Sequence, residues 1–314
     1  MLYSQTPPKP KSKVGGCIGI GCLGCIGVLV VLALLIGGFF YSMTRVSPGM
    51  ELQPEDYRTA RSHFQTHLVR HISSPQPGES LQPPPEGAKL VEYSPSLHLH
   101  AWVSPDTGGS GGKRPAVLFL HGGFAIGADD WEMTQPYRDA GYVVMTPALR
   151  GENGQQGDFS LFYDEVDDVL AAADYLAQLP YVDSKHLYVA GHSVGGTMTL
   201  LTALTSPRFQ AAASFSGASD ARSWARGQEE LVTFDKSRIQ EYQIRSAVAY
   251  AGSFQCPTRI YCGDSEILFL NSSQETSRRA QQKGLDVEAI TVPGDHSTAV
   301  PEEIRRSIAF FQSH

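Results

Sequence analysis

The residues of this chain best suited to chemistry form the segment Gly-His-Ser-Val-Gly-Gly at 191–196. An apolar run of strand type precedes this segment, and a run typical of a helix follows it. A G-x-S-x-G sequence between a strand and a helix is typical of a nucleophile elbow, a tight turn that lifts a serine oxygen clear of a sheet. Gly191 and Gly195 leave room for that turn, because glycine has no side chain to clash with neighbouring backbone. The segment predicts that Ser193 is a nucleophile, although so short a pattern also occurs by chance in loops.

A serine nucleophile needs a base to accept its proton and an acid to orient that base. In elbow-type sites the acid and then the histidine follow the serine along the chain. Two histidines follow Ser193: His296, in a loop just past the last predicted strand, and His314, which ends the chain. His296 is therefore the predicted base. The predicted acid is Glu266 or Asp264, since both follow a predicted strand at the edge where the site must lie.

Attack by a serine also requires N–H donors for the oxyanion that develops on the substrate. The first predicted donor is the backbone N–H of Val194, directly after the serine. The second is Gly123 or Phe124, from the sequence His-Gly-Gly-Phe that begins at His121 after a buried apolar run. We interpret His121 as structural and not as a second base. Such a site needs neither a metal ion nor an organic cofactor, and we expect none.

The elements that must position these residues alternate between strands and helices from about residue 88 onward. This alternation predicts an α/β fold with a mostly parallel, doubly wound sheet that helices cover on both faces. One predicted helix carries an acidic cluster, which we interpret as a solvated face and not as a metal site; it comprises Asp164, Glu165, Asp167 and Asp168. The predicted strands are 89–93, 97–103, 116–120, 141–145, 186–190, 212–215, 258–261 and 287–292.

An apolar segment near the N-terminus is long enough to cross a membrane. No charged residue occurs from Val14 to Met43, and a helix needs ~20 apolar residues to span a bilayer. Lys9, Lys11 and Lys13 precede the segment, which by the positive-inside rule predicts a cytoplasmic N-terminus and an extracytoplasmic catalytic domain. A cleaved signal peptide is the alternative, but its apolar region is usually shorter, ~7–15 residues. We therefore predict a single-pass anchor that contacts the lipid bilayer.

The expected organisation has four parts. The three lysines before residue 44 are the only charged residues there, so the remainder carries a net charge of −10 against −7 for the whole chain. This acidity argues against nucleic acid as a partner. A stretch rich in Pro, Gly and Ser at 73–87 predicts a semi-rigid spacer within the stalk. The parts are a cytoplasmic tail at 1–13, a transmembrane anchor at 14–43, a helical and Pro-rich stalk at 44–86 and a catalytic domain at 87–314, with a cap-like insertion at 221–254.

Six further segments make a family resemblance specific. They are His121-Gly122-Gly123 followed by Trp131, Gly141-Tyr142-Val143-Val144, Arg150-Gly151-Glu152-Asn153-Gly154, Leu176 to Asp183, Ser219-Asp220 and Pro293-Gly294-Asp295-His296. Residues 87–314 resemble the α/β-hydrolase fold, most closely the catalytic domain of the prolyl oligopeptidase family, with dienelactone hydrolase-like enzymes next. In such enzymes the acid usually lies three residues after a glycine, which favours Glu266 over Asp264.

The resemblance implies a membrane-anchored serine hydrolase that cleaves ester, peptide or amide bonds through an acyl-enzyme, with a peptidase favoured. Peptidases of that family often have tryptophan before the serine and tyrosine after it, whereas His192 and Val194 occupy these places here, as is commoner in esterases. Fewer than ninety residues precede the hydrolase part, so the large β-propeller of the family is not expected. A carboxylesterase or dienelactone hydrolase-like esterase is therefore the alternative. A catalytically silent fold that serves as a binding module is the alternative of another class.

The insertion at 221–254 is rich in aromatic residues. These residues either form an apolar pocket for an ester or peptide substrate or pack a small core of the insertion itself. The candidate pocket residues are Trp224, Phe234, Tyr242 and Tyr250.

Overall fold

The computed structural model describes residues 28–34, 46–76, 79–106 and 112–314. Contacts divide the chain into two compact units, Met1–Met43 and Thr44–His314. Of the predicted anchor at 14–43, only 28–34 are described, and they are helical. No helix among the described residues is both long enough and apolar enough to span a bilayer. The rest of the predicted anchor and the predicted tail at 1–13 lie outside the described residues.

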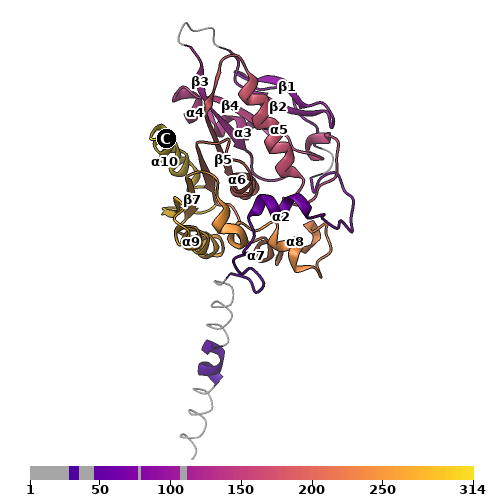
Figure 1. Ribbon diagram of the computed structural model, residues 1–314, viewed down its shortest axis with the longest axis vertical. Coiled ribbons are helices and arrows are strands. Elements are labelled where there is room, and N and C mark those ends of the chain that lie inside the picture. The colour runs from indigo at the N-terminus through magenta and orange to yellow at the C-terminus, as the bar shows by residue number, and fades with distance from the viewer. Residues whose placement is uncertain (1–27, 35–45, 77–78, 107–111) are drawn as a thin grey trace, which may run out of the picture. The chain divides into compact units, whose positions relative to one another are not determined.

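The second unit is built on one eight-stranded sheet (Figure 1). Its strands are β1 (Lys89–Ser94), β2 (Leu99–Val103), β3 (Arg114–Leu120), β4 (Val143–Pro147), β5 (Val182–His192), β6 (Ala211–Phe215), β7 (Thr258–Gly263) and β8 (Val287–Val292). They lie in the order β1-β2-β4-β3-β5-β6-β7-β8. Strand β2 pairs antiparallel with β1 and β4, and every other neighbouring pair is parallel. The predicted mostly parallel sheet is confirmed.

Helices cover both faces of the sheet, because successive side chains of a strand point to opposite faces. In β3, Leu118 belongs to one hydrophobic core, whereas Val117 and Phe119 belong to the other. The first core also contains side chains of α2, α5, α6 and α9, and the second contains side chains of α3, α4 and α10. The helices are α2 (Tyr57–His63), α3 (Ala128–Met133), α4 (Gln135–Asp139), α5 (Glu165–Gln178), α6 (Val194–Thr205), α7 (Ala221–Ala225), α8 (Ile239–Gln243), α9 (Ile267–Gln281) and α10 (Val300–Gln312), with 3₁₀ turns at Glu152–Gly154, Glu229–Leu231 and Ala247–Ser253.

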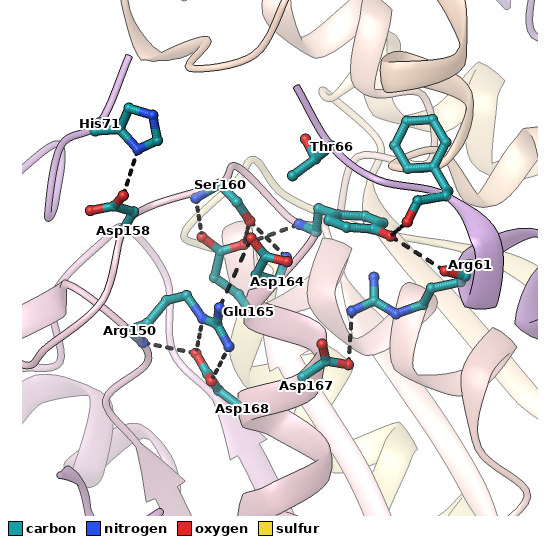
Figure 2. A network of polar contacts seen from close by, with 12 residues as sticks. Arg61, Thr66, His71, Arg150, Asp158, Ser160, Asp164, Glu165, Asp167 and Asp168 are labelled. Atoms are coloured by element: carbon teal, nitrogen blue, oxygen red, sulfur yellow. Dashed lines mark hydrogen bonds and ion pairs between the residues drawn. The ribbon is translucent and has the colours of Figure 1, made fainter. Parts of the chain in front are cut away.

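The segment that precedes the sheet packs against the rest of the second unit and is not held away from it as a spacer. Figure 2 shows two of its polar contacts. Arg61 of α2 binds Asp167 of α5 at 2.9 Å, and His71 lies 2.6 Å from the carboxylate of Asp158. The composition predicted a spacer at 73–87. Within that range the hydroxyl of Ser74 donates to the carbonyl oxygen of Phe124 at 3.1 Å, and the N–H of Leu81 donates to the carbonyl oxygen of Asn153 at 3.0 Å, so these described residues pack against the domain.

The acidic cluster on α5 is only partly solvated, so the interpretation of a solvated face is wrong for two of its four residues. Glu165 and Asp168 are buried. Glu165 accepts hydrogen bonds from the N–H and O–H of Ser160 at 2.6 Å each, and Asp168 binds the guanidinium of Arg150 at 2.7 Å (Figure 2). Burial raises the pKa of both carboxyls, and these hydrogen bonds oppose that rise. The two acids therefore fix the chain around residues 150–165.

Candidate active site

The turn around Ser193 has the geometry of a nucleophile elbow. Strand β5 ends at His192 and α6 begins at Val194, so a single residue joins them. Ser193 has φ 57° and ψ −114°, a conformation that costs a non-glycine residue energy and persists only when its surroundings impose it. A Cβ at Gly195 would lie 2.0 Å from the carbonyl oxygen of Leu120, so only glycine fits there. The tight packing of α6 on β3 thus holds the strained serine in place.

The structure brings Ser193, His296 and Glu266 together in one hydrogen-bonded chain. Nε2 of His296 lies 2.9 Å from Oγ of Ser193, and Nδ1 of His296 lies 2.6 Å from Oε1 of Glu266. The alternative acid, Asp264, instead accepts a hydrogen bond from the N–H of Gly294 at 3.2 Å. Glu266 is therefore the acid that the geometry supports, and Asp264 supports the loop that carries the histidine.

The surroundings of Glu266 favour its ionised form. Its Oε2 accepts hydrogen bonds from the N–H of Gly263 at 2.7 Å and from the hydroxyl of Ser216. Burial raises the pKa of Glu266, but the hydrogen bonds from His296, Ser216 and Gly263 outweigh burial and hold this pKa below its ordinary value. An ionised carboxylate can only accept, so Nδ1 of His296 carries the proton and Nε2 presents its lone pair to Ser193. This is the tautomer that a general base requires.

Two rings contact the imidazole of His296. The ring of Phe269 stacks on it with centroids 5.6 Å apart. His192 lies 4.8 Å from it, centroid to centroid, and its Nε2–H donates to the carbonyl oxygen of His296 at 2.7 Å. Burial lowers the pKa of His192, which keeps this neighbour neutral when His296 takes up a proton. The residue before the serine therefore supports the histidine loop, a role that the sequence did not indicate.

Of the two candidates for the second oxyanion donor, the structure favours Gly123. The N–H of Phe124 donates to Oε1 of Gln76 at 2.6 Å and is thus already engaged. Gly123 has φ 67°, in the left-handed region that favours glycine. The N–H of Val194 lies in the first turn of α6, where helix geometry supplies no intrahelical acceptor.

A buried ion pair lies beneath the loop that carries Gly123. Nε2 of His121 lies 2.9 Å from Oε2 of Glu152, and both side chains are buried. Burial lowers the pKa of His121, but the charge of Glu152 and its hydrogen bond outweigh burial and raise this pKa to about 9. His121 therefore anchors the loop and does not face Ser193, as we interpreted from the sequence. In the sequence, Glu152 was indicated only by its motif, Arg-Gly-Glu-Asn. That His121 is the partner of Glu152 could not be identified without the fold.

A cavity of about 210 Å³ lies next to the site, because Phe269 lines this cavity and also stacks on His296. Its wall combines apolar side chains with polar groups, as in many small-molecule sites. Larger depressions of about 670 and 730 Å³ lie along residues 58–71, but no member of the hydrogen-bonded chain lines them. The wall of the smaller cavity comprises Ala218, Asp220, Ser223, Trp224, Arg226, Gly227, Gln228, Leu268, Phe269 and Ser272.

Of the four aromatic residues predicted for a substrate pocket, only Trp224 lines this cavity. The rings of Phe234 and Tyr242 pack edge to face on one another with centroids 5.0 Å apart. Tyr250 packs in the same way on Tyr57 of α2, also at 5.0 Å. These three residues therefore form the core of the insertion and its contact with α2, which is the alternative that the sequence left open.

Comparison with known proteins agrees with this geometry. A family model described as the prolyl oligopeptidase family matches residues 129–314. The curated protein "Uncharacterized peptidase YtmA" of Bacillus subtilis (strain 168) is 27% identical over 166 residues, which cover 49% of this chain and 64% of that protein. The match therefore spans slightly less than two thirds of the relative's own length.

Solved structures share the fold at lower identity. A puromycin-hydrolyzing peptidase of Mycobacterium tuberculosis superposes with a TM-score of 0.63 and 22% identity, over 72% of this chain and 38% of that one. A putative dienelactone hydrolase from Klebsiella pneumoniae subsp. pneumoniae MGH 78578 superposes with a TM-score of 0.56 and 18% identity, over 72% of this chain and 98% of that one. The α/β-hydrolase fold expected from the sequence is confirmed.

Proposed function

Since the chain belongs to the prolyl oligopeptidase family and is a serine hydrolase, we propose that it cleaves peptide or amide bonds through an acyl-enzyme formed on Ser193. The observation that carries this proposal is the continuous hydrogen-bonded chain from Ser193 through His296 to Glu266. It combines a nucleophile, a base in the correct tautomer and an acid that orients the base.

In the proposed reaction, Oγ of Ser193 attacks the substrate carbonyl while Nε2 of His296 accepts the serine proton. Glu266 accepts Nδ1–H and stabilises the imidazolium that forms. The N–H groups of Val194 and Gly123 bind the oxyanion. His296 then donates the proton to the leaving group, and a water molecule activated by the same histidine hydrolyses the acyl-enzyme.

A fluorophosphonate probe tests this proposal, because it labels an activated serine covalently. The full-length protein is expected to be labelled, Ser193→Ala to be unlabelled, and the control Ser206→Ala, at the far end of α6, to be labelled like wild type. A folded wild-type protein that resists labelling would contradict the catalytic assignment.

A matched pair of variants tests whether Glu266 or Asp264 is the acid that orients His296. Glu266→Gln keeps the shape but removes the charge that orients His296, so we expect kcat to fall by about 10²–10⁴-fold. Asp264→Asn is the control, and its kcat is expected to stay within a few-fold of wild type. The reverse ranking would assign the acid to Asp264.

An esterase is the second candidate, and two observations favour it. His192 and Val194 flank the serine, and the fold extends over nearly the whole of a putative dienelactone hydrolase. Esters and anilides that share one acyl group separate the candidates by their kcat/KM values. Measurable turnover of prolyl or aminoacyl anilides supports the peptidase, whereas turnover of short-chain p-nitrophenyl esters alone supports the esterase.

We propose further that residues 14–43 anchor the chain in a membrane, with the N-terminus in the cytoplasm and the catalytic domain outside it. The charge-free sequence from Val14 to Met43 and the three lysines before it support this proposal. The protein is expected to resist extraction by alkaline carbonate and to lose its catalytic domain to protease added outside intact cells. A mature chain whose N-terminus lies after residue 43 would instead identify a cleaved signal peptide.

A further inference from the structure

The segment before the sheet runs directly against the loop that carries Gly123. We call residues 72–76 the strap. At its start, the N–H of Phe159 donates to the carbonyl oxygen of Ile72 at 2.8 Å. The carbonyl group of the next strap residue, Ser73, lies against Gly151. A Cβ added to Gly151 would lie 1.6 Å from this carbonyl oxygen. Only glycine at 151 admits the strap, and this glycine belongs to the same Arg-Gly-Glu-Asn motif whose glutamate holds His121.

The strap binds both backbone polar groups of Phe124. The hydroxyl of Ser74 donates to the carbonyl oxygen of Phe124 at 3.1 Å. The N–H of Phe124 donates to Oε1 of Gln76 at 2.6 Å. The two strap residues also support each other, because the N–H of Gln76 donates to Oγ of Ser74 at 3.1 Å. The strap therefore fixes the plane and direction of the backbone at Phe124.

The loop needs such support. Gly122 and Gly123 are successive glycines, and glycine has the least intrinsic conformational preference of any residue. Gly123 adopts φ 67°, and a Cβ built on it would lie 3.2 Å from Oε1 of Gln76. On the far side of Phe124, the side chain of Asn153 holds Ile126 through two hydrogen bonds of 2.8 and 3.1 Å. The loop is thus held after its glycines at Phe124 and Ile126, and before them by the contact of His121 with Glu152.

We propose that Gln76, supported by Ser74, is a positioning residue for the oxyanion hole. Its contact with Phe124 fixes the backbone one residue after Gly123 and so aims the N–H of Gly123 at the developing oxyanion. The inference rests on the proposed roles of Ser193 and Gly123. In this arrangement, the segment before the catalytic domain supports the backbone of the oxyanion hole.

The first test is Gln76→Ala in the full-length protein. Gln76 is exposed, so its truncation is expected to leave the melting temperature within error of wild type. Removing a whole oxyanion donor costs ~10²–10³-fold in kcat; misaligning a donor that stays in place is expected to cost about tenfold. KM is expected to change little, because the weakened interaction forms in the transition state. Gln82→Ala is the matched control, since the side chain of this exposed glutamine has one hydrogen bond among the described residues, to the carbonyl oxygen of Ser80 at 3.1 Å.

A transition-state analogue separates positioning from a merely structural role. A trifluoromethyl ketone with the acyl group of the substrate forms a tetrahedral adduct whose oxygen occupies the oxyanion hole. Gln76→Ala is expected to weaken its binding by the same factor as kcat, while the pH profile of kcat/KM stays unchanged because the hydrogen-bonded chain at Ser193 is untouched.

Ser74→Ala provides an independent variant, because it removes the other bond to Phe124. The two substitutions act on the two backbone polar groups of one residue, Phe124, so the double variant is expected to lose less kcat than the product of the two single losses. A wild-type kcat in Gln76→Ala, or a loss confined to KM or to the melting temperature, would overturn the inference. An inactive wild type would instead overturn the proposed function, so the two failures are distinguishable.

Discussion

Glu303, a buried carboxyl near the active site, is expected to change the free energy of unfolding with pH by an amount that its pKa sets. Glu303 of α10 is fully buried, and within the described part of the chain neither of its carboxyl oxygens has a hydrogen-bond partner. Burial, and then the nearby charge of Glu266, raises the pKa of Glu303 from 4.5 to about 8. At neutral pH the carboxyl is thus protonated in the native state and ionised in the unfolded state.

This difference makes Glu303 destabilising, and increasingly so as the pH rises from 4.5 toward 8. The unfolded state alone gains the free energy of ionisation, which is about 1.4 kcal/mol for each pH unit above the ordinary pKa. The loss of stability is therefore about 3 kcal/mol at pH 7. Below the ordinary pKa both states are protonated, and the effect vanishes.

Glu303→Gln tests this reasoning, because glutamine mimics the protonated carboxyl in shape and does not ionise. At pH 7 we expect the melting temperature of the full-length protein to rise by about 6–12 °C, since 1 kcal/mol corresponds to roughly 2–4 °C for a domain of such size. At pH 5 the loss of stability is only about 0.7 kcal/mol, so the rise is expected to be about 1–3 °C. The control is the neighbouring Glu302→Gln, which removes a partly exposed carboxylate paired with Arg305 and Arg306 and is expected to give no rise. No gain for Glu303→Gln at pH 7, or the same gain at both pH values, would contradict a raised pKa of Glu303.

Three further outcomes follow from the geometry around the elbow. The free energy of unfolding of Ser193→Gly, measured in urea, is expected to exceed that of Ser193→Ala by about 1 kcal/mol, because glycine relieves the strain at φ 57°. Gly195→Ala is expected to lose more than ~3 kcal/mol and all probe labelling, since its Cβ would lie 2.0 Å from the oxygen of Leu120. Glu152→Gln is expected to lower the melting temperature at pH 6, where the wild-type pair with His121 is fully stabilising. This difference should disappear as the pH rises through about 9, the pKa to which that pair raises His121; an unchanged gap at pH 10 would contradict the assignment.

The part of the site that the sequence could predict is the part that depends on local pattern and chain order. The elbow is a short segment with glycines at fixed places, and the strand before it and helix after it can be recognised from residue types alone. His296 could be predicted because few histidines follow Ser193. The choice between Glu266 and Asp264 could not be made from residue types, because two carboxyls two residues apart differ only in where the loop aims them.

The remainder depends on contacts between distant residues. Gln76 and Phe124 are 48 residues apart, and no local pattern relates a glutamine in a Pro-rich stretch to a backbone N–H. In the insertion, Phe234, Tyr242 and Tyr250 belong to the core, whereas Trp224 lines the cavity. All four are aromatic, so residue type alone could not distinguish them. Likewise, acidic residues on a helix face are usually exposed to solvent. Glu165 and Asp168 can be buried because Ser160 and Arg150, which lie outside the helix, form hydrogen bonds with them.

Amide cleavage demands more of the base than ester cleavage does, although the nucleophile is the same. An alkoxide leaves an ester readily, whereas an amine must be protonated by His296 as it departs. Amide cleavage therefore requires an imidazolium that is both stabilised and correctly aimed. In this site Glu266 binds Nδ1 at 2.6 Å, His192 holds the backbone of His296 at 2.7 Å and Phe269 stacks on its ring. This threefold support of one histidine meets the demand of amide cleavage and agrees with the proposed peptidase, but ester cleavage through the same residues is equally compatible with it, and the residues beside Ser193 resemble those of esterases.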